Sequence, residues 1–332
     1  MNKKWIIYIV LIVVAFVLIV VFSKNIYFWL SNQLWKILSS RPFSAAAGCW
    51  DASEARKTGH SKATAINRFD VLKRTIRLHI SPCPNDTFMF DALVNGRIDC
   101  GELTFEVAYY DIEELNRRAE AGETDVSKIS YALLPEIQSR YTLLDSGSAL
   151  GRGNGPVFVA RQGTPPDSIR RVAVPGMHTT ANALMSRLYP SITQKKPVLF
   201  SEIAPAVARG EYDAGVLIHE GRFVYRKLGL ELVADLGELW ESRTGLPLPL
   251  GAIVARRTLP EELRCEIERL LRTSIEYAFA HREESRTYIK EHARELDDRV
   301  IDHHIDFFVN SYSLSLGDEG RRAVRELTGV EV

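Results

Sequence analysis

Residues 75–88 read TIRLHISPCPNDTF, and this stretch holds the pattern that repeats through most of the chain. Its first half, TIRLHIS, is typical of a short strand. Two prolines then end the strand, and Asn85 and Asp86 are residue types that cap helix N-termini. The stretch therefore predicts a strand over 75–81 that leads into a helix reaching about residue 94.

Strand-like and helix-like segments alternate over the rest of the chain. Further strands are expected over 103–110, 125–130, 157–161, 172–174, 198–200, 214–219, 232–236 and 251–255. Helices are expected over 112–121, 131–140, 179–189, 203–208 and most of 260–327. This alternation predicts an α/β fold with a largely parallel sheet and helices on its faces. Neither a G-x-G-x-x-G turn after a strand nor a P-loop motif occurs, so dinucleotide and P-loop chemistry are not expected.

The composition excludes several classes of protein. The 332 residues include 42 Lys and Arg against 42 Asp and Glu, so the net charge is zero and no nucleic-acid surface is expected. The four cysteines have no C-x-x-C spacing, and the eight histidines form no convincing pattern of two histidines with a carboxylate. We therefore expect no metal and a small molecule as the partner, while the oligomeric state is not predicted.

The N-terminus differs from the rest of the chain. Residues 5–22 read WIIYIVLIVVAFVLIVVF, an uncharged run about long enough to cross a bilayer. We expect a transmembrane helix there, within a hydrophobic segment over 1–40, and a polar linker without periodicity over 41–72. A start codon assigned too early is the alternative, although no methionine occurs between Met1 and Met89.

Three of the expected turns join a strand to a helix, and together they predict a cleft. They are SPCPNDTF at 81–88, VSKISY at 126–131 and VAVPGMHTTA at 172–181. Ligands of open α/β sheets bind at the carboxyl ends of strands, and helix N-terminal amides attract carboxylates. Lys128 is expected to hold an anionic group, and Thr180 with the amide of Ala181 a ligand oxygen. Taken alone, the turns at 81–88 and 126–131 are slightly better explained as helix caps, and it is the three turns together that predict the cleft.

A histidine is also expected at the carboxyl end of a strand. The strand over 214–218 delivers His219 to its carboxyl end, where imidazole is the usual general base near neutral pH, although a structural histidine is the alternative. The glycine-rich run at 147–156 is either a hinge or a site where Arg152 binds a carboxylate. Cys83 is not expected to be a nucleophile, because nothing basic adjoins it in the sequence.

Six motifs in this order resemble those of the 1,4-dihydroxy-6-naphthoate synthase family. They are SPCPNDTF, SKISY, GSALGRGxGP, VAVPGxxTTA, IHExR and TGLPLPLGAI. The resemblance covers about residues 75–327, and residues 1–72 have no counterpart in it. It implies a fold like the type II periplasmic binding proteins, with two α/β lobes that face each other across a cleft.

The chain of such a fold crosses twice between its lobes. We expect lobe one to hold 73–160 and 250–332, and lobe two to hold 161–249. The crossings are expected near 159–170 and 246–252.

The resemblance also implies a reaction. The family is a group of carbon–carbon lyases that convert cyclic dehypoxanthine futalosine into 1,4-dihydroxy-6-naphthoate and release a three-carbon fragment, dihydroxyacetone, on the futalosine route to menaquinone. No cofactor is implied. A catalytic domain in the cytoplasm is expected, anchored to the membrane if residues 5–22 span it. The alternative is a membrane-tethered solute-binding protein of the same fold without catalytic activity.

The residues of the implied site are carried over from the motifs. His219 is implied as the proton acceptor. The implied substrate-binding strips are Lys128, Ile129 and Ser130 on one side, and Thr180 and Ala181 facing them. Further binding candidates, from their expected place in the cleft, are Asn85, Thr87, Ser148 and Arg152.

Overall fold

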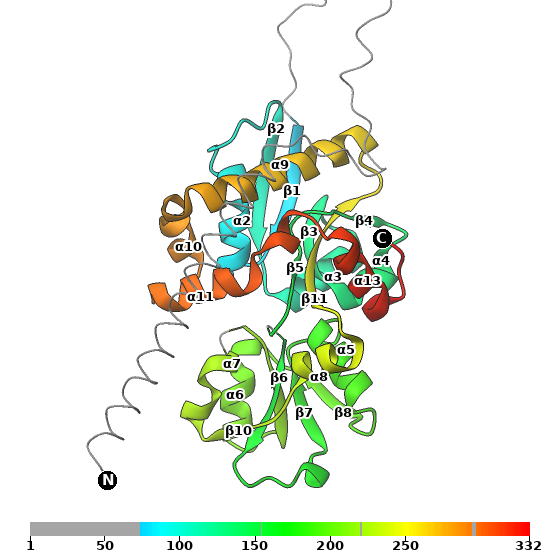
Figure 1. The fold of residues 1–332 in the computed structure, drawn as a ribbon, viewed down its shortest axis with the longest axis vertical. Coiled ribbons are helices and arrows are strands. Elements are labelled where there is room, and N and C mark those ends of the chain that lie inside the picture. The colour runs from blue at the N-terminus through cyan, green and yellow to red at the C-terminus, as the bar shows by residue number, and fades with distance from the viewer. Residues whose placement is uncertain (1–73, 154, 220, 294–296) are drawn as a thin grey trace, which may run out of the picture. The chain divides into compact units, whose positions relative to one another are not determined.

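The computed structural model describes residues 74–153, 155–219, 221–293 and 297–332. Their elements form two sheets, each with its own helices, which we call the first and second lobe (Figure 1). The segment at 1–40, the expected membrane helix at 5–22 and the linker at 41–72 lie outside these residues. Among the described helices, none is both long enough and apolar enough to cross a membrane. The anchoring and the cytoplasmic location stay predictions.

The sheet of the first lobe is built from strands at both ends of the described chain. It comprises β1 (Arg74–Ile80), β2 (Leu103–Tyr109), β3 (Val126–Ser130), β4 (Tyr141–Leu143), β5 (Ala149–Gly151) and β11 (Leu248–Arg256). The strands follow the order β2-β1-β3-β11-β4, and β5 also pairs with β11. β1 runs parallel to β2 and β3, whereas β11 runs antiparallel to β3, β4 and β5.

Helices cover both faces of this sheet. They are α2 (Pro84–Val94), α3 (Ile112–Ala121), α4 (Leu134–Ile137), α9 (Glu261–Ala280), α10 (Arg286–His292), α11 (Asp298–Phe308), α12 (Ser311–Leu314) and α13 (Gly317–Thr328), with 3₁₀ turns η2 (Tyr131–Leu133) and η5 (Arg282–Ser285). On one face α2, α9, α10 and α11 pack around apolar side chains of β1 such as Leu78. On the other face α3 and α13 pack around β3 and β11, with Ile129 and Val254 in the core.

Helix α2 is buried on all sides. Residues Pro84 to Leu93 are all buried, because the sheet covers one side of the helix and α9, α10 and α11 cover the others. Its carboxylates, Asp86 and Asp91, therefore need polar partners inside the protein. Asp91 accepts hydrogen bonds from Arg97 at 2.9 Å and from Ser285 at 2.8 Å. The partners of Asp86 belong to the site described below.

The second lobe is a continuous stretch of chain. Its strands are β6 (Val157–Arg161), β7 (Arg171–Val174), β8 (Gln194–Pro197), β9 (Ala214–Leu217) and β10 (Leu230–Asp235), in the order β10-β6-β9-β7-β8. Its helices are α5 (Thr180–Leu188), α6 (Phe200–Ala208), α7 (Gly221–Val224) and α8 (Leu236–Thr244), with η3 (Pro166–Ser168) and η4 (Tyr225–Leu228). α5 and α8 pack on one face of the sheet, and α6 packs on the other.

Two expectations about this fold are wrong. The sheets are mixed rather than largely parallel, because the chain leaves the first sheet for the second and returns through β11, which runs against β3. No strand occupies 198–200, since Phe200 already begins α6. The strand of this region is β8, with the polar sequence QKKP. It forms one edge of the sheet, where apolar residues are not required.

The first passage between the lobes comes earlier than expected. β5 ends at Gly151 in the first sheet and β6 begins at Val157 in the second, whereas the expected crossing lay near 159–170. The return begins after α8, and β11 starts at Leu248, close to the expected 246–252.

Gly155 lies on this first passage and touches Gly237 at the start of α8. A Cβ atom on Gly155 would lie 2.3 Å from Gly237 Cα. Glycine is therefore required where the two backbones meet.

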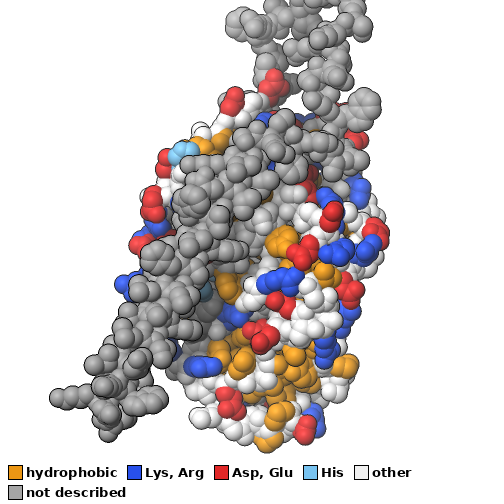
Figure 2. Space-filling model, viewed as in Figure 1, with side chains coloured by type: hydrophobic (Ala, Val, Ile, Leu, Met, Phe, Trp, Pro, Cys, Tyr) orange, Lys and Arg blue, Asp and Glu red, His pale blue; other side chains and the backbone are white. Residues whose placement is uncertain are grey.

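On the face seen in Figure 2, Lys and Arg side chains are intermixed with Asp and Glu side chains, in keeping with the zero net charge. A surface of this kind does not attract a polyanion along that face.

We predict that Gly155→Ala destabilises the protein by about 1–3 kcal/mol, because the added methyl group must push two backbones apart. Urea unfolding of the full chain, followed by circular dichroism, measures this. Gly221→Ala is the matched control, since its Cβ would meet only Leu217, at an ordinary 3.5 Å. Equal midpoints for the two variants would contradict the prediction.

Candidate active site

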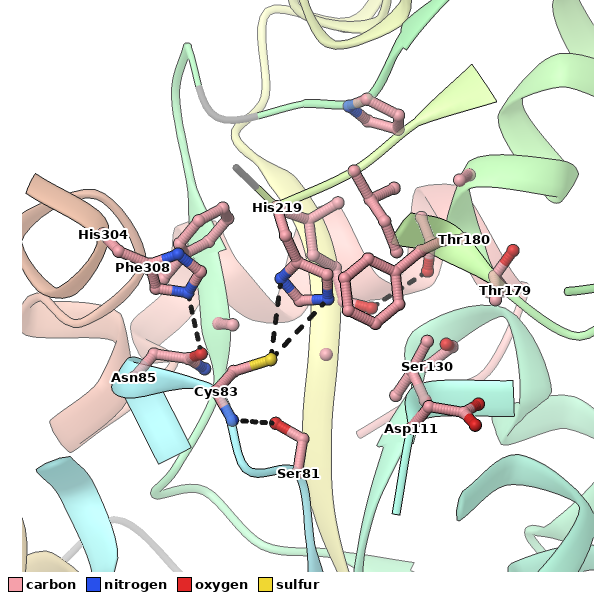
Figure 3. A pocket seen from close by; sticks show the side chains of 18 of the residues that line it. Ser81, Cys83, Asn85, Asp111, Ser130, Thr179, Thr180, His219, His304 and Phe308 are labelled. Carbon is pink, nitrogen blue, oxygen red and sulfur yellow. Dashed lines mark hydrogen bonds between the residues drawn. The ribbon is translucent and has the colours of Figure 1, made fainter. Parts of the chain in front are cut away.

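A cavity of about 140 Å³ lies between the two lobes (Figure 3). The turn before α2 and the end of β3 line it from the first lobe, and the N-terminus of α5 and the end of β9 line it from the second. α11 contributes a further wall. The three strand-to-helix turns that predicted a cleft therefore meet at one cavity.

His219 follows β9 and faces this cavity. Its backbone has φ 52°, and it is the only described non-glycine residue with positive φ. Histidine tolerates this left-handed conformation better than most residues, and such backbone strain clusters at functional sites. The imidazole is half-buried, with its centroid 5.0 Å from that of Phe200 and 5.7 Å from that of His304. The turn thus aims a partly enclosed imidazole at the cavity.

Cys83 lies beside His219, although the sequence places nothing basic next to it. The sulfur is 4.0 Å from both ring nitrogens of His219. The fold thus gives Cys83 a basic neighbour from the second lobe, and the expectation that Cys83 is not a nucleophile stays a prediction. Its thiol is one wall of the space around the imidazole (Figure 3).

A buried ion pair lies at the cavity wall. Lys128 Nζ is 2.5 Å from Asp86 Oδ1, and their side chains are 6% and 0% exposed. The carboxylate of Asp86 also accepts hydrogen bonds from Ser81 N at 3.1 Å, Ser81 Oγ at 2.8 Å and Asn85 Nδ2 at 2.8 Å. Asp86 thus neutralises the ammonium group, and Lys128 is held in one position by its partner.

Polar groups from both lobes face the cavity. In the first lobe, Ser130 N donates to Asn116 Oδ1 at 2.8 Å, and Asn116 Nδ2 donates back to Ser130 Oγ at 3.1 Å. In the second lobe, Thr180 Oγ1 donates to Leu250 O at 3.0 Å, and Ala181 follows in the first turn of α5. A helix N-terminus directed at a cavity is a favourable position for a carboxylate of a ligand.

Six of the ten site residues expected from the sequence line the cavity. They are Asn85, Lys128, Ser130, Thr180, Ala181 and His219. The other four do not line it: Thr87, Ile129, Ser148 and Arg152.

Each of these four has a different surrounding. Ile129 points into the core, because successive side chains of a strand alternate between faces. Thr87 donates to Cys83 O within α2, and Ser148 Oγ lies 2.6 Å from the hydroxyl of Tyr131. Arg152 is about half exposed and donates to Glu319. These four therefore lie outside the cavity lining, and a direct contact of theirs with the substrate stays a prediction.

Sequence reasoning missed the contribution of α11. His304 and Phe308 line the cavity from this helix, and His304 is 4% exposed. A signal was present: Ile301, His304, Ile305 and Phe308 follow the i, i+3, i+4, i+7 spacing of a buried helix face. Burial lowers the pKa of His304 well below its ordinary 6.5, and nearby His219 and Lys128 lower it further. His304 is therefore an uncharged ring in the wall of the cavity.

The turn before α5 also fastens the second lobe to the first. The Glu113 carboxylate of α3 accepts hydrogen bonds from Met177 N at 2.9 Å and His178 N at 3.3 Å, and lies 3.1 Å from His178 Nδ1. A Cβ atom on Gly176 would lie 2.2 Å from this carboxylate, so only glycine fits there. This contact holds the two walls of the cavity together.

One described group of side chains could hold a metal ion. Ligand atoms of Glu120, Glu136 and His178 lie within 4.8 Å of one another, but the group is outside the cavity lining. The absence of a metal from the site stays a prediction.

Comparison with known families establishes the kind of protein. Residues 76–330 match the family model described as menaquinone biosynthesis. The chain belongs to this family. Two curated relatives named 1,4-dihydroxy-6-naphtoate synthase match 76% of the chain. The Thermus thermophilus protein is 50% identical with 92% of its length covered, and the Streptomyces coelicolor protein is 45% identical with 91% covered. This member of the menaquinone biosynthesis family is thus an enzyme of the 1,4-dihydroxy-6-naphthoate synthase group.

Solved structures agree on the fold of the family member. An Archaeoglobus fulgidus protein is 35% identical, with a TM-score of 0.70 over 76% of this chain and 95% of its own. A Candida albicans protein described as having the generic periplasmic binding protein structural fold is 11% identical, with a TM-score of 0.60 over 76% of this chain and 89% of its own. The expected likeness to periplasmic binding proteins is confirmed for the fold.

We predict that Glu113→Ala loosens the contact between the lobes. The amides of Met177 and His178 lose a charged acceptor, so their hydrogen exchange should become about tenfold faster. Exchange measured by mass spectrometry on the full chain tests this. Glu123→Ala is the control, because Glu123 pairs with Arg118 within the first lobe. Unchanged exchange in Glu113→Ala would contradict the inferred contact.

Burial of His304 predicts a pH dependence of stability. Its folded-state pKa is lower than 6.5, so the unfolded chain binds a proton first as the pH falls. The free energy of unfolding should therefore drop below pH 6.5, by about 1.4 kcal/mol per pH unit from this group. In His304→Gln this part of the slope disappears, which urea unfolding between pH 5 and 7 measures. His303→Gln, at the exposed neighbouring position, should keep the wild-type slope. Equal slopes in all three proteins would contradict the prediction.

Proposed function

We propose that the enzyme converts cyclic dehypoxanthine futalosine into 1,4-dihydroxy-6-naphthoate and dihydroxyacetone, with His219 as the general base. The observation that carries this proposal is the position of His219, whose imidazole faces a cavity that both lobes line. The names of the two relatives support 1,4-dihydroxy-6-naphthoate as the product, and the sequence motifs support the substrate.

Binding is the first task of the residues around the cavity. The substrate has a carboxylate that the product retains, and the N-terminus of α5 with Thr180 and Ala181 suits this group. Ser130 and Asn85 face the cavity from the first lobe and offer polar contacts to the sugar-derived ring. The apolar rings of Phe200 and Phe308 suit the aromatic part of the substrate.

Proton transfer is the second task. A proton must leave the sugar-derived ring before the carbon–carbon bond breaks, and His219 is placed to accept it. The electron pair of the broken carbon–carbon bond leaves with one fragment, and that fragment takes up the proton that His219 removed, so the charge and the number of hydrogen atoms are unchanged. Aromatisation of the second ring then favours the products. The reaction needs no external oxidant or reductant, since the two products together contain the atoms of the substrate.

Exclusion of water is the third task. The contact of Glu113 with the turn at Met177 and His178 holds the lobes together around the cavity. An enclosed site prevents water from intercepting the intermediate and strengthens its electrostatic interactions.

We predict that His219→Ala lowers kcat/KM by about 10²- to 10⁴-fold, the usual contribution of a general base. The full-length enzyme and the variant would each be mixed with cyclic dehypoxanthine futalosine, and dihydroxynaphthoate would be followed by mass spectrometry. His281→Ala, outside the cavity at the end of α9, should keep wild-type activity. Product from His219→Ala at the wild-type rate would refute the role of this base. Binding without turnover in the unmodified chain would favour the solute-binding alternative.

A further inference from the structure

We propose that His304 is a positioning residue for His219, and that a buried hydrogen-bond chain through Asn85 holds it in place. The inference rests on the proposed function and deepens it, because it adds a second imidazole to the proposed base. The two rings are nearly parallel, with an interplanar angle of 13° and centroids 5.7 Å apart. Phe308 lies one helical turn from His304, with ring centroids 4.7 Å apart. His219 therefore rests against a ring that is itself packed in place (Figure 3).

The hydrogen-bond chain begins at the ion pair of Lys128 and Asp86. Asn85 Nδ2 donates to Asp86 Oδ1 at 2.8 Å, and Asn85 Oδ1 lies 3.1 Å from His304 Nε2. A carboxylate held by an ammonium group only accepts hydrogen bonds, so the amide nitrogen of Asn85 must face it. The amide oxygen then faces the histidine, and His304 Nε2 must donate. The network thus assigns one tautomer to His304, with its proton on Nε2.

This tautomer has a consequence for proton transfer. The nitrogen of His304 that faces Asn85 already carries a hydrogen, and its ring is uncharged because burial, together with the nearby Lys128, His219 and His303, lowers the pKa of His304 well below its ordinary value. His304 therefore does not compete with His219 for the substrate proton. When His219 becomes an imidazolium ion, it faces the π system of a neutral ring rather than a second cation, which is a favourable contact.

Charged groups of both signs lie near the rings of His219 and His304. Lys128 and Asp86 form one neutral pair at the start of the chain, and the thiol of Cys83 lies on a different side of His219 from His304. His303 is exposed on the same helix, with its ring centroid 5.4 Å from that of Phe307. No described carboxylate other than that of Asp86 takes part in the chain from Lys128 to His304.

Two variants separate the two contacts of His304. His304→Phe keeps a ring against His219 but cannot donate to Asn85, whereas His304→Gln keeps a donor but has no ring. We expect each to lower kcat by about 10- to 100-fold with KM changed less than threefold, because a base held less firmly loses rate rather than affinity. His303→Gln is the matched control and should keep wild-type kcat. If both His304 variants retain kcat within twofold while His219→Ala is inactive, the positioning role is refuted and the proposed function stands.

A second measurement does not depend on turnover. The full-length chain labelled with ¹⁵N-histidine would be examined by long-range ¹H–¹⁵N correlation from pH 8 to 5, with the His304 signals assigned by their loss in His304→Gln. We expect the Nε2–H tautomer and no titration over this range. In Asn85→Ala the chain is cut, and the second tautomer should appear. A proton on Nδ1, or titration near pH 6.5, would refute the proposal even if the enzyme is active. If the unmodified chain shows the Nε2–H tautomer without titration but forms no dihydroxynaphthoate, the proposed function fails and the hydrogen-bond chain stands.

Discussion

The site depends on the buried ion pair between Lys128 of β3 and Asp86 of α2. Buried charges are costly unless they are paired and fully hydrogen-bonded, and removing one partner leaves the other uncompensated, at a cost of about 3–5 kcal/mol. Here the carboxylate is satisfied by the ammonium group, by both donors of Ser81 and by Asn85. The pair therefore fixes how the turn before α2 sits on β3, and through Asn85 it fixes the ring of His304.

The same pair explains a glycine in the neighbouring strand. A Cβ atom on Gly251 of β11 would lie 2.6 Å from Cε of Lys128, so the lysine side chain crosses β11 only where that strand has no side chain. The preceding residue, Leu250, accepts the hydrogen bond from Thr180 of the second lobe. One strand thus gives space to the ion pair and also anchors the helix N-terminus on the opposite wall of the cavity.

Much of the fold and of the candidate site could be predicted from the sequence, because the α/β alternation and the strand-to-helix turns are local patterns. The turn at 81–86 and His219 at the end of β9 are examples. Contacts between distant segments could not be predicted in this way. His304 follows α9 and α10 in the chain, and only the packing of α11 against α2 brings it to Asn85. Ile129 was carried over with its motif, although strand alternation turns its side chain to the core. β8 was not predicted, because a polar edge strand lacks the apolar pattern by which strands are recognised in a sequence.

The route of the chain has a consequence for its synthesis. The strands of the second lobe are contiguous in the sequence, whereas β11, which lies between β3 and β4 in the first sheet, follows all of them. As the chain leaves the ribosome, all strands of the second lobe are synthesised before β11. Until β11 has been synthesised, the edge of β3 that pairs with it has no partner strand. Pairings between segments so far apart form late and slowly. Because β11 also lines the cavity, the pocket cannot form before this strand has paired, and α11, which is synthesised later still, adds a further wall.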